Sequence, residues 1–448
     1  MASTSISFTA RRLTRHAILT AGTCGSLISM TSALAGPLDY LATSPYLLGS
    51  WNGQRERLAD AGVTFEFTYT NEAAHNLSGG TDRLTRAAQQ LAAGVSVDLD
   101  KLWGVRHTTF NFELTDRFGR SLDADANLGT SQQTQEIYGR GQTVWLTKMT
   151  LDRTFIDGRL LVSIGRDSEG QSFDVSDCNF QNLALCGPQA SNLYGDYAMS
   201  WPGSVWMGRV KYDTTASTYV QAGVYQQSPT YYEASWERRN AWLPTGAGGT
   251  DGAVLPVEFG FTPTLNGLKG TYKLGFMYNT GGQPDLVRDV NGNLRALTGL
   301  PAGQSSSSYN AYIAVAQQLT GKDGGEGLTV NLRGVWGDRA TSALDRQMSL
   351  GFEYKEPFHR AGDRIGVGMA ATHSSSRAAD YQATYNALHP ADASAVGRGY
   401  ETTYELFYSW RVVPTVSLQP DLQYIVHPGG TSQNANAFVV GLKSTVYF

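Results

Sequence analysis

The chain has 448 residues, 50 of them glycine, and carries 35 basic against 39 acidic side chains, which gives a formal net charge of −4. A charge so close to neutral argues against nucleic acid as a partner and against a polybasic membrane-binding patch. Beyond the N-terminus, no run of about eighteen apolar residues occurs, so a transmembrane helix is excluded there. The length then leaves several soluble domains or one large β-barrel.

The first 35 residues have the pattern of a cleaved signal peptide. Basic Arg11, Arg12 and Arg15 precede an apolar stretch, and Ala33-Leu34-Ala35 supplies the small-x-small cleavage pattern. Residues 1–35 are therefore expected to be removed, which places the mature chain outside the cytoplasm.

The mature chain begins with a segment, 36–62, that differs from the rest. One short helix is expected from Trp51 to Ala61, with Gly62 as its stop signal. From residue 63 onward the sequence alternates between polar and apolar residues, as strands do. The segments with this alternation are 63–70, 110–114, 143–151, 159–166, 204–212, 217–225, 271–279, 309–317, 327–336, 347–355, 364–372, 402–411, 415–425 and 437–448. Weaker segments at 94–100 and 256–262 bring the number to sixteen, and bacterial single-chain barrels have even strand numbers.

Long segments rich in Gly, Ser, Asn and Asp separate some of these strands. They are 119–141, 167–203, 226–255, 280–308 and 373–399. Loops of this length are uncommon in compact soluble domains, whereas barrels have long loops at one rim and short turns at the other. The longest, 167–203, is our candidate for a loop that folds inward and narrows a pore.

This loop contains Cys178 and Cys186, the only cysteines after residue 35. An exported chain meets an oxidising compartment in which two such thiols normally pair, so a disulfide is expected. A zinc site is the alternative reading. It lacks ligands, because no histidine lies near and two thiolates alone bind zinc poorly. We therefore expect no metal site.

The strand pattern continues to the last residues, Val446-Tyr447-Phe448. An unprotected edge strand invites aggregation, whereas a barrel has no edge because its last strand pairs with its first. Phe448, preceded by aromatic residues at alternate positions, resembles the signal by which the bacterial barrel-assembly machinery recognises its substrates. The sequence therefore predicts an all-β fold, a transmembrane antiparallel β-barrel of bacterial outer-membrane type over residues 63–448.

Several motifs resemble those of the carbohydrate-selective porins of the OprB family. Their order over nearly the whole mature sequence carries the resemblance more than any one of them. Ser50 and His427 depart from the residues that the family more often has, which leaves solute preference open. The similar positions are 48–62, 76–80, 163–166, Phe173, 180–182, 202–209, 222–225, 405–408, 419–425 and 428–430.

The resemblance implies a water-filled pore through which sugars diffuse passively, without cofactor or covalent chemistry. Sugars, outer-membrane lipid and the assembly machinery are the implied partners, and homo-oligomerisation stays open. A non-selective diffusion pore is the first alternative. A barrel enzyme is the second, because His373-Ser374-Ser375 loosely echoes the histidine–serine pair of a barrel phospholipase. Neither G-x-S-x-G nor H-E-x-x-H is present to support catalysis.

Strand parity identifies the candidate pore-lining residues, because a charge on the lipid face near mid-bilayer costs about 2–4 kcal/mol. Each of them either hydrogen-bonds sugar hydroxyls or holds an inward loop. Trp145, Trp206 and Trp336 are candidates for stacking on sugars if they face inward, and interface anchors if they do not. The pore-lining candidates are Glu66, Glu113, Lys148, Arg333, Glu353, Glu405, Asp421 and Gln423, with Arg166 added at a strand end.

Overall fold

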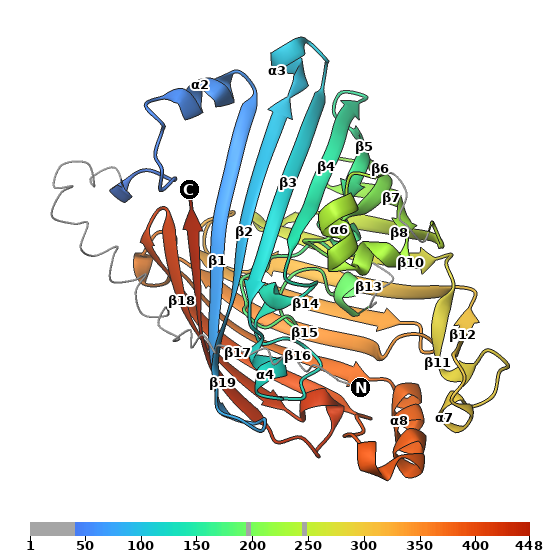
Figure 1. Ribbon diagram of the computed structural model, residues 1–448. Helices are drawn as coiled ribbons and strands as arrows, with labels where there is room; N and C mark the ends of the chain where they lie inside the picture. The colour runs from blue at the N-terminus through green and yellow to red at the C-terminus, as the bar shows by residue number, and fades with distance from the viewer. Residues whose placement is uncertain (1–40, 194–198, 244–248) are drawn as a thin grey trace, which may run out of the picture.

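The computed structural model describes residues 41–193, 199–243 and 249–448 (Figure 1). The expected signal peptide, residues 1–35, lies outside the described residues. The chain forms a closed antiparallel β-barrel in which each strand pairs with the next along the wall, and β1 pairs with β19 to close it. The wall contains β1 (Val63–Ser78), β2 (Thr85–Asp98), β3 (Thr108–Gly119), β4 (Val144–Phe155), β5 (Leu160–Asp167), β6 (Val205–Asp213), β7 (Thr218–Gln227), β8 (Gly252–Phe261), β10 (Leu268–Asn279), β13 (Ser308–Gln318), β14 (Gly327–Gly337), β15 (Leu344–Lys355), β16 (Arg364–Ser374), β17 (Tyr400–Val413), β18 (Val416–Val426) and β19 (Ala437–Tyr447).

The prediction of sixteen strands is confirmed. The main sheet has 17 strands, but β9 (Thr264–Leu265) only extends the turn before β10. The two weakest expected segments, 94–100 and 256–262, belong to strands that begin earlier, β2 and β8. The helix expected over 51–61 is shorter, α2 (Gln54–Asp60), because Trp51, Asn52 and Gly53 have positive φ values of 51°, 57° and 78° and cannot continue a right-handed helix.

The two rims of the barrel differ. One rim has short turns, α3 (Leu99–Trp103) and the segment that carries α2 (Figure 1). The other rim has the long loops, with α4 (Leu122–Asp125), α5 (Gln189–Leu193), α6 (Ala234–Asn240), α7 (Arg295–Thr298), α8 (Ser376–Leu388) and the hairpin of β11 (Gln283–Asp289) and β12 (Ala302–Ser305). No helix in the described part of the chain is long and apolar enough to cross a membrane.

Alternation along each strand separates the two faces of the wall. In β17, Glu405 is 2% exposed whereas the next residue, Leu406, is 43% exposed. In β18 the same contrast separates Asp421 at 2% from Leu422 at 42%. Polar side chains are therefore the buried ones, which is the reverse of a soluble sheet. They are buried because loops enter the barrel and pack against them.

Candidate pore constriction

The loop between β5 and β6, residues 168–204, crosses the lumen and is fixed to the opposite wall. The backbone N–H groups of Gln181 and Asn182 donate to the two carboxylate oxygens of Glu405 at 2.6 and 3.0 Å. The Asn182 side chain donates to Gln423 at 2.9 Å, and the ring of Phe180 meets that of Phe407 edge-on at 4.9 Å. Strands β17 and β18 thus hold the inner end of this loop.

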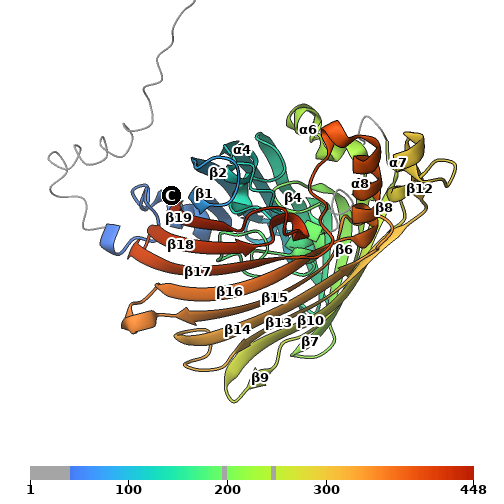
Figure 2. The same cartoon turned by 90° about the horizontal axis from the view of Figure 1, so that it is seen from below.

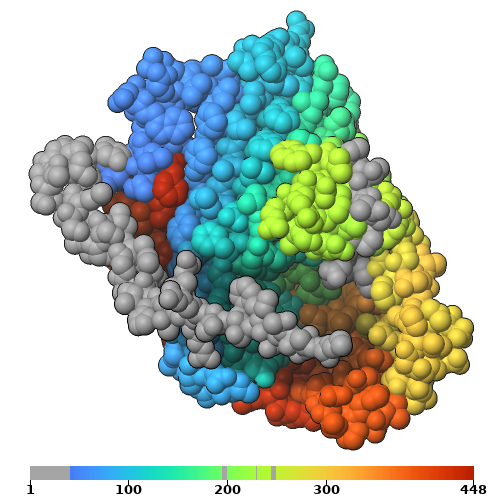
Figure 3. All heavy atoms as spheres, in the orientation of Figure 1, coloured from blue at the N-terminus to red at the C-terminus, as the bar shows by residue number. Residues whose placement is uncertain are grey.

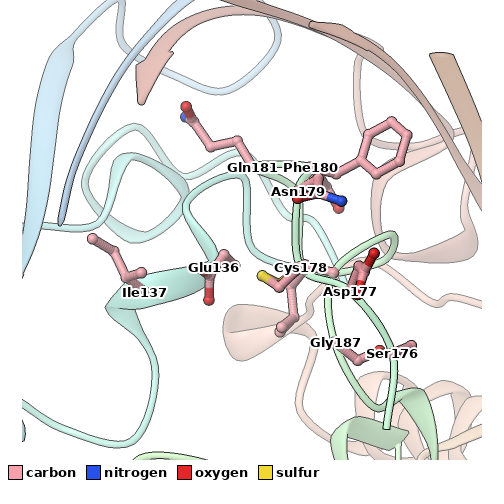
Figure 4. The surroundings of a disulfide bond; sticks show 12 residues. Glu136, Ile137, Ser176, Asp177, Cys178, Asn179, Phe180, Gln181 and Gly187 are labelled. Carbon is pink, nitrogen blue, oxygen red and sulfur yellow. Dashed lines mark hydrogen bonds between the residues drawn. A yellow bond between two sulfur atoms is a disulfide. The ribbon is translucent and has the colours of Figure 1, made fainter. Parts of the chain in front are cut away.

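A second set of contacts holds the loop near its disulfide. Arg333 donates to the carbonyl of Gly187 at 2.8 Å, and Asn179 donates to Glu353 at 2.7 Å. Between these anchors Cys178 and Cys186 form the expected disulfide, with their Cα atoms 4.2 Å apart (Figure 4). The loop is therefore closed on itself where it narrows the pore.

A second loop, residues 120–143, also enters the lumen. The N–H groups of Ser131 and Gln132 donate to Glu401 at 2.5 and 3.1 Å, and the N–H of Ile137 donates to Glu72 at 3.3 Å. In Figure 4, Glu136 and Ile137 lie beside the disulfide of loop 168–204.

The two loops are also bonded to each other. The N–H of Glu136 donates to the carbonyl of Gln181 at 3.0 Å, and the N–H of Leu183 donates to that of Gln133 at 2.9 Å. These backbone bonds make the loops one partition. The expected inward loop is present, but it forms only half of the constriction.

Loop 168–204 contains two buried carboxyl groups that accept its own backbone N–H groups. Glu169 accepts from Met199 and Asp174 from Ala190, both at 2.8 Å. Burial raises the pKa of Glu169 to about 8. Burial likewise raises the pKa of Asp174 to about 6. We therefore expect the internal structure of the loop to depend on pH.

A cavity of about 760 Å³ remains between this partition and one side of the wall. The strands β1, β2, β3 and β19 supply that side, and most of the lining residues are polar. Among the residues that line it are Thr68, Thr70, Gln90, Arg117, Lys443 and Thr445 from the wall, and Glu136, Arg140, Ser176, Asn192, Trp201 and Tyr232 from the loops.

Charged side chains in this cavity are held in a bonded group. Arg117 donates to Gln90 at 2.9 Å and to the carbonyl of Gly139 at 3.0 Å, and its guanidinium lies 4.0 Å from Glu136. Lys443 lies 3.4 Å from Glu136 and 3.0 Å from the buried Glu72. The Lys443 ammonium and the Arg117 guanidinium thus share one carboxylate, which fixes their positions in the cavity wall.

An aromatic side chain lies next to this group. The indole N–H of Trp201 donates to Glu113 at 3.1 Å, and the guanidinium of Arg117 lies 5.0 Å from its ring centroid. Arg140 stands 5.6 Å from the ring of Tyr232. Aromatic rings and charged hydrogen-bonding groups therefore line one cavity.

The model of one protein family, described as carbohydrate-selective porin, OprB family, matches residues 83–448. The chain belongs to this family.

Relatives and solved structures agree with this assignment. Porin B of Pseudomonas aeruginosa is 36% identical, over 97% of this chain and 99% of the relative. The putative porin QuiX of Acinetobacter baylyi is 32% identical, over 90% of this chain and 93% of the relative. The high-pH structure of Pseudomonas putida OprB superposes with a TM-score of 0.86 at 36% identity, covering 91% of this chain and 99% of that one. As an OprB porin, the chain is a carbohydrate porin of the bacterial outer membrane.

Four of the nine pore-lining candidates bond the partition and a fifth bonds one of these four, and none of the five lines the cavity. Arg333, Glu353, Glu405 and Gln423 bond loop 168–204, and Asp421 accepts from Gln423 at 2.9 Å. For each of them the sequence left two functions open, binding of sugar hydroxyls and holding of an inward loop. Direct contact of these residues with sugar stays a prediction.

The remaining four candidates are dispersed. Glu113 meets the cavity through Trp201, and Lys148 lies 3.5 Å from Asp167. Glu66 lies on β1 opposite Gly94, outside the cavity lining. Arg166 is fully buried against Glu237 of α6, at 2.8 Å, and does not line the cavity either.

The three tryptophan candidates are also outside the cavity lining. Trp145 is fully buried. Trp336 is 38% exposed and lies at the strand parity opposite to the lumen-facing Arg333, so it faces lipid. Trp206 precedes the buried Met207 on β6, so it lies on the opposite, outer face of the strand. Its indole donates to the carbonyl of Leu243 at 3.0 Å.

Sequence reasoning missed several residues that line the cavity. Arg117 has the inward parity of Glu113 but lies beyond the expected strand 110–114, and β3 extends to Gly119. Lys443 lies within an expected strand at inward parity, so the signal for it was present. Trp201 and Tyr232 lie in loops, where no periodicity indicates which side chains face the pore.

Proposed function

We propose that glucose-type sugars diffuse passively through the cavity between the partition and strands β1, β2, β3 and β19. The observation that carries this proposal is the meeting of the Trp201 ring with Arg117 and Glu113 in a polar passage. A sugar ring has an apolar C–H face and polar hydroxyl edges. An aromatic face with charged groups at its border complements both, and the lining of a pore sets its selectivity.

Arg117 retains hydrogen-bonding capacity for a solute. Its bonds to Gln90 and Gly139 use Nε and Nη1, and Nη2 lies at the long distance of 4.0 Å from Glu136. A guanidinium has five N–H donors, so donors remain for hydroxyl oxygens. Glu136 offers acceptor oxygens to hydroxyl protons in the same passage.

The proposal includes no catalysis. His373 meets Asp345 through Nδ1 at 2.7 Å and Arg346 through Nε2 at 3.1 Å. An arginine only donates, so Nε2 accepts and is already occupied. Ser374 donates to the carbonyl of Gly429 at 2.9 Å, and Ser375 is fully buried. These contacts favour a structural role for this histidine over that of a base that activates a serine.

The remaining partners belong to the same proposal. The exposed apolar residues of the outer wall, such as Leu406 and Leu422, suit contact with outer-membrane lipid. The strand that ends at Phe448 is proposed to be recognised by the barrel-assembly machinery. Residues 36–62 are proposed to form a periplasmic segment at the mouth, which the packing of α2 against β1 supports.

Liposome swelling with the purified, refolded chain tests the proposal. Glucose, a disaccharide and a neutral amino acid of similar size to glucose are compared. We expect glucose to enter faster than the amino acid, and Arg117→Gln to reduce this preference. Lys211→Gln, at inward parity on β6 but outside the cavity lining, is the matched control. Entry by size alone would indicate a general diffusion pore, and the absence of swelling would contradict a pore of either kind.

A further inference from the structure

The loop between β7 and β8, residues 228–251, carries α6 on the outside of the barrel. Seen from the long-loop side, α6 lies beyond the ring of strands, next to β4 (Figure 2). In the space-filling view the yellow-green part of this loop, which contains α6, forms a raised patch on the outer surface (Figure 3). An outer-membrane barrel meets lipid on this surface, so a loop placed there displaces lipid from the wall.

A buried ion pair fixes α6 to the wall. Arg166 of β5 and Glu237 of α6 lie 2.8 Å apart, and both side chains are 0% exposed. Arg166 also donates to the carbonyls of Ala241 and Ser204, and its guanidinium lies 5.0 Å from the ring of Tyr231. Charge, hydrogen bonds and a ring therefore hold the helix in one position.

The free side of α6 has two neighbouring cations. Arg238 and Arg239, in the last turn, are exposed, and neither forms an ion pair with a carboxylate among the residues that the structure describes. The only hydrogen bond described for the two side chains runs from Nε of Arg239 to the carbonyl of Ser235, at 3.0 Å. Both guanidinium groups keep free Nη donors, in the fork geometry that binds phosphate.

An exposed apolar pair follows directly. Trp242 is 56% and Leu243 49% exposed. The Trp242 ring stacks on Phe112 of β3 at 6.1 Å with an interplanar angle of 8°, so it lies along the outer wall. Cations are thus followed within four residues by an aromatic and an aliphatic side chain on the lipid side of the barrel.

The patch adjoins strand ends at the long-loop rim, which is the extracellular rim of such barrels. Arg166, which pairs with Glu237 of α6, lies at the end of β5 that meets the long loops. It also donates to the carbonyl of Ser204, the residue directly before β6. Strand ends at this rim emerge from the hydrocarbon layer, where aromatic residues prefer to lie. There, cations face lipid phosphates while the apolar pair reaches acyl chains.

We propose that α6, with Arg238, Arg239, Trp242 and Leu243, is a binding site for a phosphorylated lipid of the outer leaflet. The two guanidinium groups bind the phosphate, and the indole and Leu243 pack on an acyl chain. A second copy of the chain suits the patch less well. A two-fold interface would place this pair of cations against the same pair of the other copy.

Native mass spectrometry of the purified full chain tests this site. The probes are a bis-phosphorylated lipid A, its dephosphorylated form and inorganic phosphate. We expect the chain to retain the phosphorylated lipid at least about tenfold better than the dephosphorylated one, with a loss of that preference in Arg238→Gln/Arg239→Gln. Arg106→Gln, an exposed arginine in a turn at the other rim, is the matched control.

Trp242→Ala separates the two parts of the site. It should weaken retention of the lipid and leave the preference for phosphate intact, and swelling with glucose verifies that each variant still forms a pore. Equal retention of both lipids, or no effect of the double variant, would overturn the proposal. So would competition by inorganic phosphate alone, or a dimer that dissociates in Trp242→Ala.

Discussion

Trp201 is held on both sides in the constriction, by Glu113 at its indole N–H and by Arg117 at its face. This arrangement fixes the ring so that one face remains for solute. Since both contacts come from β3, the ring is positioned by the rigid wall although Trp201 itself belongs to a loop.

Removing this ring should reduce sugar entry more than entry of other solutes. Contacts of aromatic rings contribute about 0.5–1.5 kcal/mol, so Trp201→Ala should lower the apparent affinity for glucose by about two- to thirteenfold. The dependence of glucose influx on concentration measures this affinity. Trp336→Ala, on the lipid side of β14, is the control, and an equal effect of both variants would refute the role of Trp201.

Glu405 offers a second test at this scale, because its two oxygens accept two backbone N–H groups of loop 168–204. In Glu405→Gln only one acceptor oxygen remains, so one buried N–H loses its partner at about 1–3 kcal/mol. We expect faster proteolysis within this loop, read by mass spectrometry of the fragments. Glu66→Gln, another carboxylate of the lumen wall, should leave the cleavage rate unchanged.

At the residue scale, parity predicted the direction of side chains but not their partners. It placed Glu405, Gln423 and Arg333 inside, where they are, because alternation has one period along any strand. Whether such a residue meets solute or a loop depends on where the loop goes. That depends on tertiary contacts, and Trp201 was missed for the same reason.

Among the elements, loop 168–204 is one whose stability should depend on pH. The pKa of Glu169 is raised to about 8, against roughly 4.3 in an unfolded chain. Between these values the folded loop binds more protons than the open one, so the free energy of opening falls as pH rises. The stabilisation is fully present below the pKa of the open loop and is lost as the pH rises through the pKa of the folded loop. Asp174 acts in the same direction up to about pH 6.

Hydrogen exchange, corrected for intrinsic rates, measures this dependence. Protection of the amides of this loop should decrease from about pH 5 to about pH 9. Glu169→Gln should flatten the decrease above about pH 6, because the amide side chain does not ionise. Asp177→Asn, at an exposed position in the same loop, is the control. A wild-type loop with constant protection would contradict the prediction.

The strands themselves could be predicted and the partition only in part. In β17, β18 and β19, apolar residues that face lipid occur at every second position, and this alternation predicts the strands. The second inward loop, 120–143, was expected only as a long loop, since the backbone bonds of Glu136 and Leu183 to the other loop leave no pattern in side chains. Arg166 was misplaced for a related reason. It lies at a strand end, next to Gly165 with φ of 135°, and faces α6.

For the whole molecule, closure of the barrel rests on the pairing of β1 with β19 and on one side chain that ties this seam to α2. Arg55, which is 7% exposed, donates to the carbonyls of Phe448 and Phe65, both at 2.9 Å. Its guanidinium also lies 3.3 Å from the ring centroid of Tyr46. The N-terminal segment thereby joins both strands of the seam.

Arg55→Ala should weaken the closed barrel. Loss of two hydrogen bonds from a charged donor costs about 3 kcal/mol or more, so the unfolding temperature should fall. The temperature at which the folded band disappears in a heat-shift electrophoresis measures it. Arg57→Ala, on the exposed side of the same helix, should have no effect. The even strand number and the closure of the barrel could be predicted from the sequence. The contacts of Arg55 could not, because Arg55 and Phe448 lie 393 positions apart.

The hydrogen bonds between loops 120–143 and 168–204 bear on the design of new pores. Each loop completes the backbone pairing of the other, so transplanting either one alone into a different barrel would leave unpaired N–H and carbonyl groups at the narrowest point. A chimera that receives both loops, together with their wall acceptors Glu401 and Glu405, would keep the hydrogen bonds of the partition. We therefore expect a solute preference to be transferred to another barrel only when both loops are exchanged together.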